Sequence, residues 1–213
     1  MTRRIVQAPQ LSSLHLEVRE GLGLDARGVF ENEWFSGEFE RNLQGMSLTG
    51  CMVADSSLDG IDLSSSTFTE CELTGLDAPG WRMARTVLRD VEVADSRFGA
   101  ADFAEADLFS VKFSGCKFAW TNHSGGTLRD VLFEDCVFDE VDLSQAQAQR
   151  VAFRGCRART LRVDAARMKD VDFRGLDFDA ISGVGSLKGA VLTNTQAIHL
   201  APAMAAFLGA IVD

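Results

Sequence analysis

The sequence predicts an all-β fold: a solenoid of square coils, each built from four segments of equal length, followed by a short α-helical tail at the C-terminus. Three observations predict it. Large apolar residues recur every five positions, glycines keep the same register, and cysteines recur every 20 positions. A period of five matches neither an α-helix, with 3.6 residues per turn, nor a plain strand, with two. The chain is therefore a repeat protein, and by length it forms one domain.

The five-residue period is clearest between residues 101 and 118, where one position is always large and apolar: Phe103, Leu108, Phe113 and Phe118. The same register gives 28 such positions from residue 43 to residue 178, and 19 of them are Leu or Phe. Leu and Phe make up 37 of 213 residues, so chance would place about five there. The register is therefore a property of the fold.

A coil with a corner at every fifth position explains the pattern. In strand-like backbone, the large residue and the residue two before it share a face, so both point inward. The other three positions face water, and successive coils stack at about 4.8 Å. Nine of the 19 glycines follow the large residue by two positions, where a corner with positive φ is expected. Six of them are Gly50, Gly60, Gly115, Gly125, Gly155 and Gly175.

The cysteines give independent support for a coil that repeats every 20 positions. Cys51 and Cys71 are 20 positions apart, and so are Cys116, Cys136 and Cys156. All five take the small inward position, so we expect buried thiols that fill the core. No spacing of Cys or His predicts a metal site. One irregular stretch, residues 75–81, decides their arrangement: a five-residue bulge would place all five on one face, and no bulge would place them on two adjacent faces.

The repeat motif itself identifies a resemblance. A small residue, an acidic residue and Leu or Phe follow one another in Ala101-Asp102-Phe103, Ala106-Asp107-Leu108 and Val141-Asp142-Leu143. These segments resemble the pentapeptide-repeat proteins, and the resemblance covers about two-thirds of the chain. It implies a right-handed quadrilateral β-helix. Some members that act on gyrase carry loops projecting from the coil, which draws attention to residues 77–81.

We expect three parts along the chain. Residues 1–29 form an N-terminal capping segment, in which Leu14, Leu16 and Val18 alternate like a strand before Gly21 and Gly23. Residues 30–192 form the β-helix. Residues 193–213 form a helical dimerisation tail, with an N-cap at Thr193–Thr195, an end at Gly209, and two short helices or a kink at Pro202. Its candidate dimer residues are Ile198, Met204, Phe207, Leu208 and Ile211. The tail resembles that of gyrase-acting relatives, which implies a homodimer.

Charge and composition exclude several classes of function. The net charge is −10 and the pI about 4.8. Residues 31–148 hold 22 acidic and eight basic side chains, whereas residues 149–174 hold eight basic and three acidic ones. Direct nucleic-acid binding is therefore disfavoured. No apolar run is long enough for a membrane span and no signal peptide is evident, so we expect a cytoplasmic protein without membrane contact.

An enzyme is not expected, and neither is a cofactor. The repeat faces are convex, and catalysis needs a concave site with convergent groups. His123 replaces an aromatic at an inward position, which predicts a hydrogen-bonded core residue. Four outward positions are apolar: Phe109, Trp120, Leu132 and Val137. Scattered exposed apolar residues are ordinary, and Phe109 and Trp120 are candidate partner contacts.

The acidic balance and the family resemblance together predict a DNA mimic that binds DNA gyrase or a related type II topoisomerase, inhibiting it or protecting it from a fluoroquinolone-type poison. The candidate partner-binding residues are Glu70, Asp90, Glu92, Asp95, Asp102, Glu105 and Asp107. Without a bulge, Glu70, Asp90, Asp130 and Asp170 form one column, interrupted by Ser110 and Arg150. The alternative is a structural or adaptor module that binds another protein.

Overall fold

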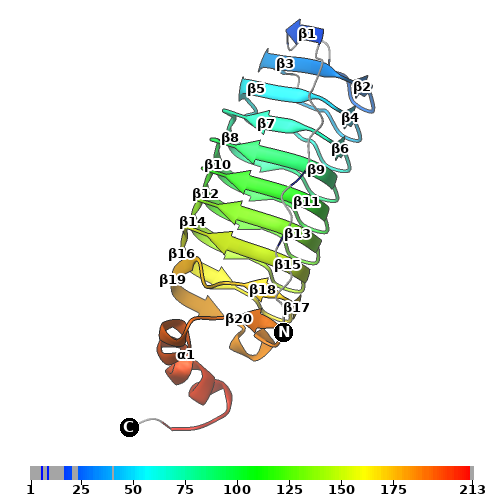
Figure 1. Ribbon diagram of the computed structural model, residues 1–213. Coiled ribbons are helices and arrows are strands. Elements are labelled where there is room, and N and C mark those ends of the chain that lie inside the picture. Colours follow the sequence, from blue (N-terminus) through cyan, green and yellow to red (C-terminus); the bar gives the residue numbers. More distant parts are fainter. Residues whose placement is uncertain (1–5, 7–8, 10–16, 21–23, 40, 212–213) are drawn as a thin grey trace.

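The computed structural model describes residues 6, 9, 17–20, 24–39 and 41–211, which form a β-solenoid of about eight turns with one α-helix at its C-terminal end (Figure 1). The fold class predicted from the period of five is confirmed, while the handedness of the coil stays a prediction. Most of the predicted N-terminal cap, including Leu14, Leu16, Gly21 and Gly23, lies outside the described residues. Val18 lies in a short strand that pairs in parallel with the next layer.

Twenty strands stack along the rod, and all pairings among the described residues are parallel. The first ten are β1 (Glu17–Glu20), β2 (Val29–Glu31), β3 (Glu33–Glu38), β4 (Ser47–Thr49), β5 (Met52–Ser57), β6 (Thr67–Thr69), β7 (Glu72–Thr74), β8 (Asp77–Arg82), β9 (Val87–Ala94) and β10 (Arg97–Asp102). The others are β11 (Asp107–Ser114), β12 (Lys117–Asn122), β13 (Thr127–Glu134), β14 (Val137–Asp142), β15 (Gln147–Arg154), β16 (Cys156–Arg162), β17 (Arg167–Lys169), β18 (Val171–Asp172), β19 (Leu176–Ser182) and β20 (Ala190–Val191).

Left-handed backbone conformations mark the corners of the coil. In one coil, the corner residues Gly45, Gly50, Asp55 and Gly60 have φ of 69°, 62°, 46° and 68°. These four corners divide the coil into four equal segments, as the sequence predicts. The prediction of a left-handed corner is wrong at Gly80, which has no positive φ, and at Gly175, which is not among the residues with positive φ either. At Gly175, glycine is needed for another reason, because a Cβ would collide with the carbonyl oxygen of Phe153.

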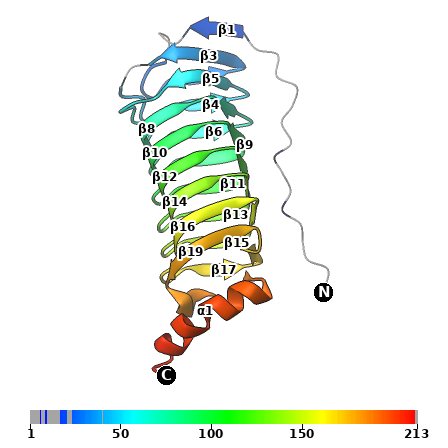
Figure 2. The ribbon, with the colours of Figure 1, turned by 90° about the vertical axis from the view of Figure 1, so that its left-hand side faces the viewer.

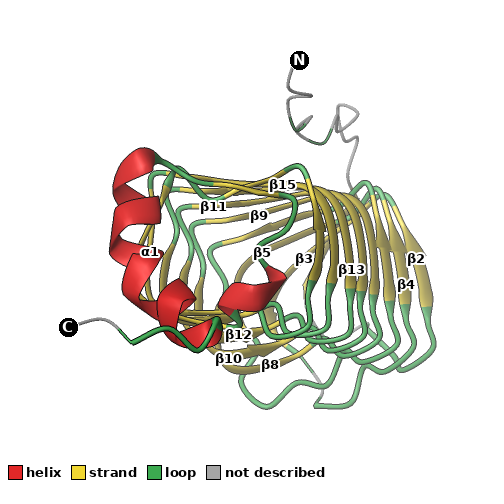
Figure 3. Ribbon diagram, turned by 90° about the horizontal axis from the view of Figure 1, so that it is seen from below, coloured by secondary structure: helices red, strands yellow, loops and turns green. Residues whose placement is uncertain are grey.

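Pairing through the middle of the rod joins equivalent positions of successive coils, and seen along the rod the strands lie in columns (Figure 3). Trp81 pairs with Ala101 in this register, so residues 77–81 do not bulge from the coil. The cysteines therefore lie in two columns on adjacent faces. One holds Cys51 and Cys71, and the other holds Cys116, Cys136 and Cys156. All five are buried free thiols.

Two deviations from the repeat compensate each other inside the coil. Ala78 takes a position that is usually large, and Trp81 takes one that is usually small, yet both are fully buried. Ala78 pairs with Phe98 of the next coil, and the indole of Trp81 stacks on the Phe98 ring with centroids 4.3 Å apart. The space above Phe98 that the small Ala78 leaves is therefore filled by Trp81, which keeps the core closely packed.

Ladders of stacked rings form the core of the lower coils. Phe113, Phe133, Phe153 and Phe173 stack in successive coils, with centroids 5.0, 4.8 and 5.6 Å apart, and all four are buried. This ladder was predicted from the sequence. A second ladder joins Phe98, Phe118 and Phe138.

His123 lies in a third inward column, with its imidazole stacked on Phe103 at 5.0 Å between centroids. Its Nε2 shares a hydrogen bond of 3.1 Å with the Thr121 hydroxyl, as expected for a hydrogen-bonded core histidine. Burial lowers the pKa of His123 to about 4, because the charged imidazolium would lose its hydration in the core. The side chain is therefore neutral at physiological pH.

The repeat ends in a shortened coil and a helix. Val171 pairs with Ala190 and not with Val191, so this coil is one position short, after the brief 3-10 helix η1 (Val184–Ser186). Helix α1 (Asn194–Phe207) then lies against the last coil, at the end of the rod opposite β1 (Figure 2). Among the described residues, no helix has the length and apolar character needed to cross a membrane.

The N-cap of α1 was predicted and its course was not. Thr193 and Gln196 form a capping box, with the Thr193 hydroxyl accepting from the Gln196 N–H at 3.1 Å. Of the two alternatives predicted at Pro202, two short helices are wrong, because Pro202 lies inside a single helix, and a kink stays a prediction. Proline removes the hydrogen bond to the carbonyl of Ile198, and because this helix lies at the surface, solvent can compensate. Gly209, with φ of 76°, follows the helix end as expected.

Candidate protein-binding surface

One side of the rod holds half of the acidic residues of its middle coils. Residues 45–144 make five coils, and we call the side formed by their residues 50–55, 70–75, 90–95, 110–115 and 130–135 the acidic face. It holds one lysine, Lys112, and nine acidic residues: Asp55, Glu70, Glu72, Asp90, Glu92, Asp95, Asp130, Glu134 and Asp135. The other sides of these coils together hold nine acidic and six basic residues. Most of the net negative charge is therefore on one face.

Aspartate and glycine alternate along one edge of the acidic face. Asp55, Gly75, Asp95, Gly115 and Asp135 follow one another in successive coils, and all have positive φ. Oδ1 of Asp95 lies 2.5 Å from where a Cβ on Gly115 would be, and Asp55 is placed in the same way against Gly75. Each carboxylate thus rests over the glycine of the next coil. The result is a row of exposed carboxylates two coils, or roughly 10 Å, apart.

Cations neutralise one part of the acidic face. Lys112 Nζ lies 3.1 Å from a Glu92 carboxylate oxygen and 3.3 Å from one of Glu134. Although burial opposes it, the hydrogen bonds and charges of these two carboxylates raise the pKa of Lys112. Arg150 donates two hydrogen bonds to Asp130, of 2.6 and 2.5 Å. Asp55, Asp90, Asp95 and Asp135 form no ion pair with any described residue, and they leave negative charge available to a partner.

Four of the seven predicted partner-binding residues lie on the acidic face: Glu70, Asp90, Glu92 and Asp95. The predicted corner column is also present, because its members have positive φ at equivalent corners of successive coils: Glu70, Asp90, Ser110, Asp130, Arg150 and Asp170. Arg150 does more than interrupt this column, since it forms the ion pair with Asp130.

The other three predicted residues lie on different sides of the rod. Asp102 Oδ1 accepts hydrogen bonds from the Ala104 N–H at 3.1 Å and from Asn122 Nδ2 at 2.9 Å, so it shapes the corner and links two coils. Asp107 lies between Arg89, at 3.1 Å, and Arg129, at 3.5 Å. Glu105 is an exposed corner residue with φ of 58°. The structure therefore does not bring the seven predicted residues together.

Sequence reasoning missed Asp55, Glu72, Glu134 and Asp135 as members of the acidic face. A signal existed, because Asp55, Asp95 and Asp135 occupy the same position of the repeat in every second coil. Finding it required comparison of alternate coils and the knowledge that residues 77–81 add no bulge. The irregular stretch therefore hid the grouping.

The C-terminal tail, α1 and the residues that follow it, exposes much of its apolar surface. Ile198, Leu208 and Ile211 are 70%, 80% and 91% exposed. Phe207 is also largely exposed, although its ring lies against Gly185 of η1, where a Cβ would collide with it. Met204 is partly buried. Four of the five candidate dimer residues thus present apolar surface to solvent.

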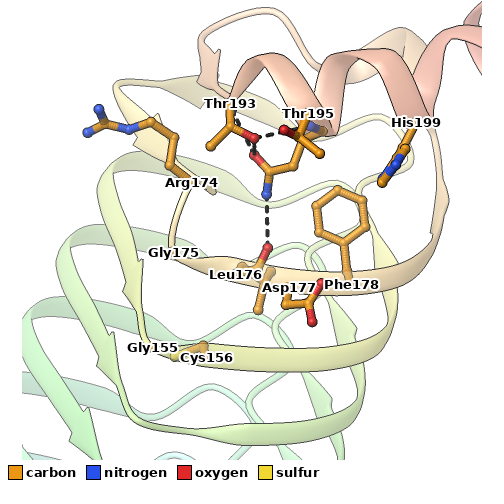
Figure 4. A pocket seen from close by; sticks show the side chains of 11 residues that line it. Gly155, Cys156, Arg174, Gly175, Leu176, Asp177, Phe178, Thr193, Thr195 and His199 are labelled. Atoms are coloured by element: carbon orange, nitrogen blue, oxygen red, sulfur yellow. Dashed lines mark hydrogen bonds between the residues drawn. The ribbon is translucent and has the colours of Figure 1, made fainter.

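An open hollow of about 440 Å³ separates the first turn of α1 from the last coil (Figure 4). The Gln196 amide spans it, donating to the carbonyl oxygens of Phe173 and Leu176 at 2.8 and 2.9 Å. His199 and Asp177 line the hollow, and no described hydrogen bond joins them. In the described part of the chain, no three His, Cys, Asp or Glu side chains are grouped to hold a metal. The contacts across the hollow hold helix α1 against the last coil.

The regularly spaced corners and the parallel stacking of the coils define a β-solenoid whose repeat unit is five residues long. No protein-family model and no curated protein matches the sequence. Among solved structures, two trypsin-treated variants of QnrB1, described as a plasmid-mediated fluoroquinolone resistance protein, are 17% and 18% identical. The matches cover 87% and 93% of this chain and 100% and 99% of theirs, with TM-scores of 0.31 and 0.30.

A further similar structure is HetL, described as a pentapeptide repeat protein involved in heterocyst differentiation regulation from the cyanobacterium Nostoc sp. strain PCC 7120. It is 18% identical over 73% of this chain and 92% of its own, with a TM-score of 0.23. Such similarities carry no argument about function, which has to come from the surface of this chain.

Proposed function

We propose that this chain is a non-enzymatic protein-binding rod that acts as a DNA mimic toward DNA gyrase or a related type II topoisomerase. The acidic face, with nine carboxylates against one lysine, is the observation that carries the proposal. A groove that binds duplex DNA is basic, and it attracts a rigid surface of opposite charge. The family resemblance of the repeat motif supports the same class of partner.

Rigidity supports this function as much as charge does. The acidic side chains project from strands and corners whose backbone is fixed by pairing to the coils on both sides, as for Asp95 between β9 and β10. A fixed row of carboxylates loses little conformational freedom on binding. The exposed Asp55, Asp95 and Asp135 are the strongest contact candidates on the acidic face, together with Asp90.

A homodimer through the C-terminal tail is part of the proposal. Ile198, Leu208 and Ile211 expose large apolar side chains at the end of the rod, which is typical of an interface. Two rods joined at these helices would present a longer acidic surface than a single rod.

An adaptor that binds another protein is the second candidate, and the basic end of the rod favours it. Arg157, Arg159, Arg167 and Lys169 are exposed and form no ion pair with any described residue. A duplex mimic has no use for these four cations, whereas a partner with separate acidic and basic patches would engage both ends.

A supercoiling assay with purified gyrase tests the proposal directly. Wild-type protein is titrated into the reaction with and without a fluoroquinolone, at two salt concentrations. We expect either inhibition or relief from the drug, weakening as salt rises because the contacts are ionic. If gyrase is unaffected at every ratio, drug and salt concentration, the topoisomerase proposal fails and the adaptor candidate remains.

A further inference from the structure

One outward position of the acidic face is apolar and yet buried. Its column contains Glu72, Glu92, Lys112, Leu132 and Ala152 in successive coils. The first three are charged, whereas the last two are only 2% and 8% exposed. A side chain that points away from the coil needs cover from outside it. That cover includes the N-terminal Val6, itself 8% exposed, which forms one apolar cluster with Leu132 and Ala152.

Ion pairs border this apolar patch on both sides. At the neighbouring corner, Asp130 pairs with Arg150. On the other side, Glu134 pairs with Lys112 at 3.3 Å and with Arg154 at 3.7 Å. Covering the patch therefore leaves no unpaired charge beneath the occupant, a condition that favours an interface core.

We propose that the patch of Leu132 and Ala152 is an anchor site for a short basic and aliphatic segment, which the chain's own N-terminus occupies through Val6. The sequence Arg3-Arg4-Ile5-Val6 has both features, two cations beside two β-branched residues. The cations suit the net charge of the acidic face, and Val6 fills the apolar patch. By occupying the patch, Val6 limits the access of a partner to this part of the acidic face. This regulatory part rests on the proposed function.

A cysteine probe tests the occupancy without any partner. In the full-length protein, Ala152→Cys adds one sulfur atom to the side chain beneath Val6. The alkylation of this thiol by iodoacetamide is followed by peptide mass spectrometry. The five native thiols are buried and serve as an internal baseline. We expect Val6→Asp to raise the alkylation rate about tenfold, because a carboxylate is not tolerated in an apolar contact. Ala119→Cys, at an exposed position on another side, is the matched control.

A peptide of residues 2–9, added to the protein with both Val6→Asp and Ala152→Cys, should slow the alkylation again. The same peptide with its valine changed to aspartate should not. Equal alkylation rates with and without Val6→Asp would overturn the proposal, as would a failure of the peptide to protect the thiol.

Gyrase titration separates the regulatory part from the proposed function. Val6→Asp should lower the protein concentration needed for half of the effect on supercoiling about threefold. Because a tenfold change in affinity corresponds to about 1.4 kcal/mol of binding free energy, this is roughly 0.7 kcal/mol. If wild type acts on gyrase and Val6→Asp acts equally, the regulatory part is overturned. If neither protein acts on gyrase, the proposed function fails. The alkylation of Ala152→Cys still tests the anchor site independently.

Discussion

The ring of Phe133 stacks on that of Phe153 with centroids 4.8 Å apart and 10° between the planes. Phe133 also stacks on Phe113, so it lies in the middle of the ladder. We expect Phe133→Ala to lower the free energy of unfolding by about 3–5 kcal/mol, because it removes a fully buried ring and leaves a cavity. Urea unfolding followed by circular dichroism measures it.

Phe109→Ala is the control for this substitution, because Phe109 points outward and is half-buried beneath Arg129, 5.7 Å from the ring centroid. It should cost about 1 kcal/mol or less. Equal losses from the two substitutions would contradict the inward ladder.

His123 makes stability depend on pH. In the folded state burial lowers its pKa to about 4, whereas in the unfolded chain it is about 6.5. Between these values the unfolded state takes up a proton that the folded state refuses, so stability falls as pH falls from 6.5 to 4. The full loss is about 3 kcal/mol. We expect His123→Phe to remove this component, which thermal melts at several pH values would show.

The quantity compared is the difference in stability between wild type and His123→Phe at each pH. This difference cancels the contribution of the carboxylates, which titrate near the lower end of the same range in both proteins. If this difference in stability stays constant from pH 7 to pH 4, the pKa of His123 is not lowered in the folded state. That result would contradict the burial of the imidazole against Phe103.

Gly115 should not tolerate a side chain. Its φ of 62° lies in the left-handed region, and Oδ1 of Asp95 lies 2.5 Å from the position of a Cβ. We expect Gly115→Ala to cost about 1–2 kcal/mol for the conformation alone. Gly80→Ala is the matched control, because Gly80 has no positive φ and nothing lies within 4 Å of its Cβ position. Equal melting temperatures for the two variants would contradict the assigned corner.

The C-terminal tail should mediate dimer formation through its exposed apolar side chains. We expect the wild type to sediment as a dimer and Ile198→Asp with Leu208→Asp to sediment as a monomer, because each change places a charge in the apolar interface. Ala201→Asp, at another exposed position of α1, should sediment as a dimer like the wild type. A doubly substituted protein that remains a dimer would place the interface elsewhere.

The sequence predicted the fold because the fold is periodic. Each coil packs only on its neighbours, so one set of inward positions recurs in every coil and is legible without knowledge of distant contacts. The Phe113–Phe173 ladder and the Thr193 N-cap follow from such local rules. The exchange of size between Ala78 and Trp81 does not, because it becomes visible only when Phe98 of the next coil is placed against both.

The binding surface was less predictable than the fold. Candidate binding residues were predicted from the charge of outward side chains. How these side chains group on one face depends on the register across residues 77–81, which the sequence left open. Asp102 and Asp107 fit the charge criterion but serve the coil itself, through Ala104 and through Arg89. Leu132 is buried in a cluster with Val6, which is far away in the sequence, so no local pattern contains this contact.

The most direct test of the proposed function is a gyrase supercoiling titration with two matched triple variants. The first changes Asp55, Asp95 and Asp135 to Asn on the acidic face, and the second changes Asp59, Asp77 and Asp139 to Asn on the adjacent side. Both remove three exposed charges, and Asn tolerates the left-handed conformation of the first set. With about 0.5 kcal/mol for each charge, the first should require about tenfold more protein for the same effect. The second should act like the wild type, and equal behaviour of the two variants would contradict a specific role for the acidic face.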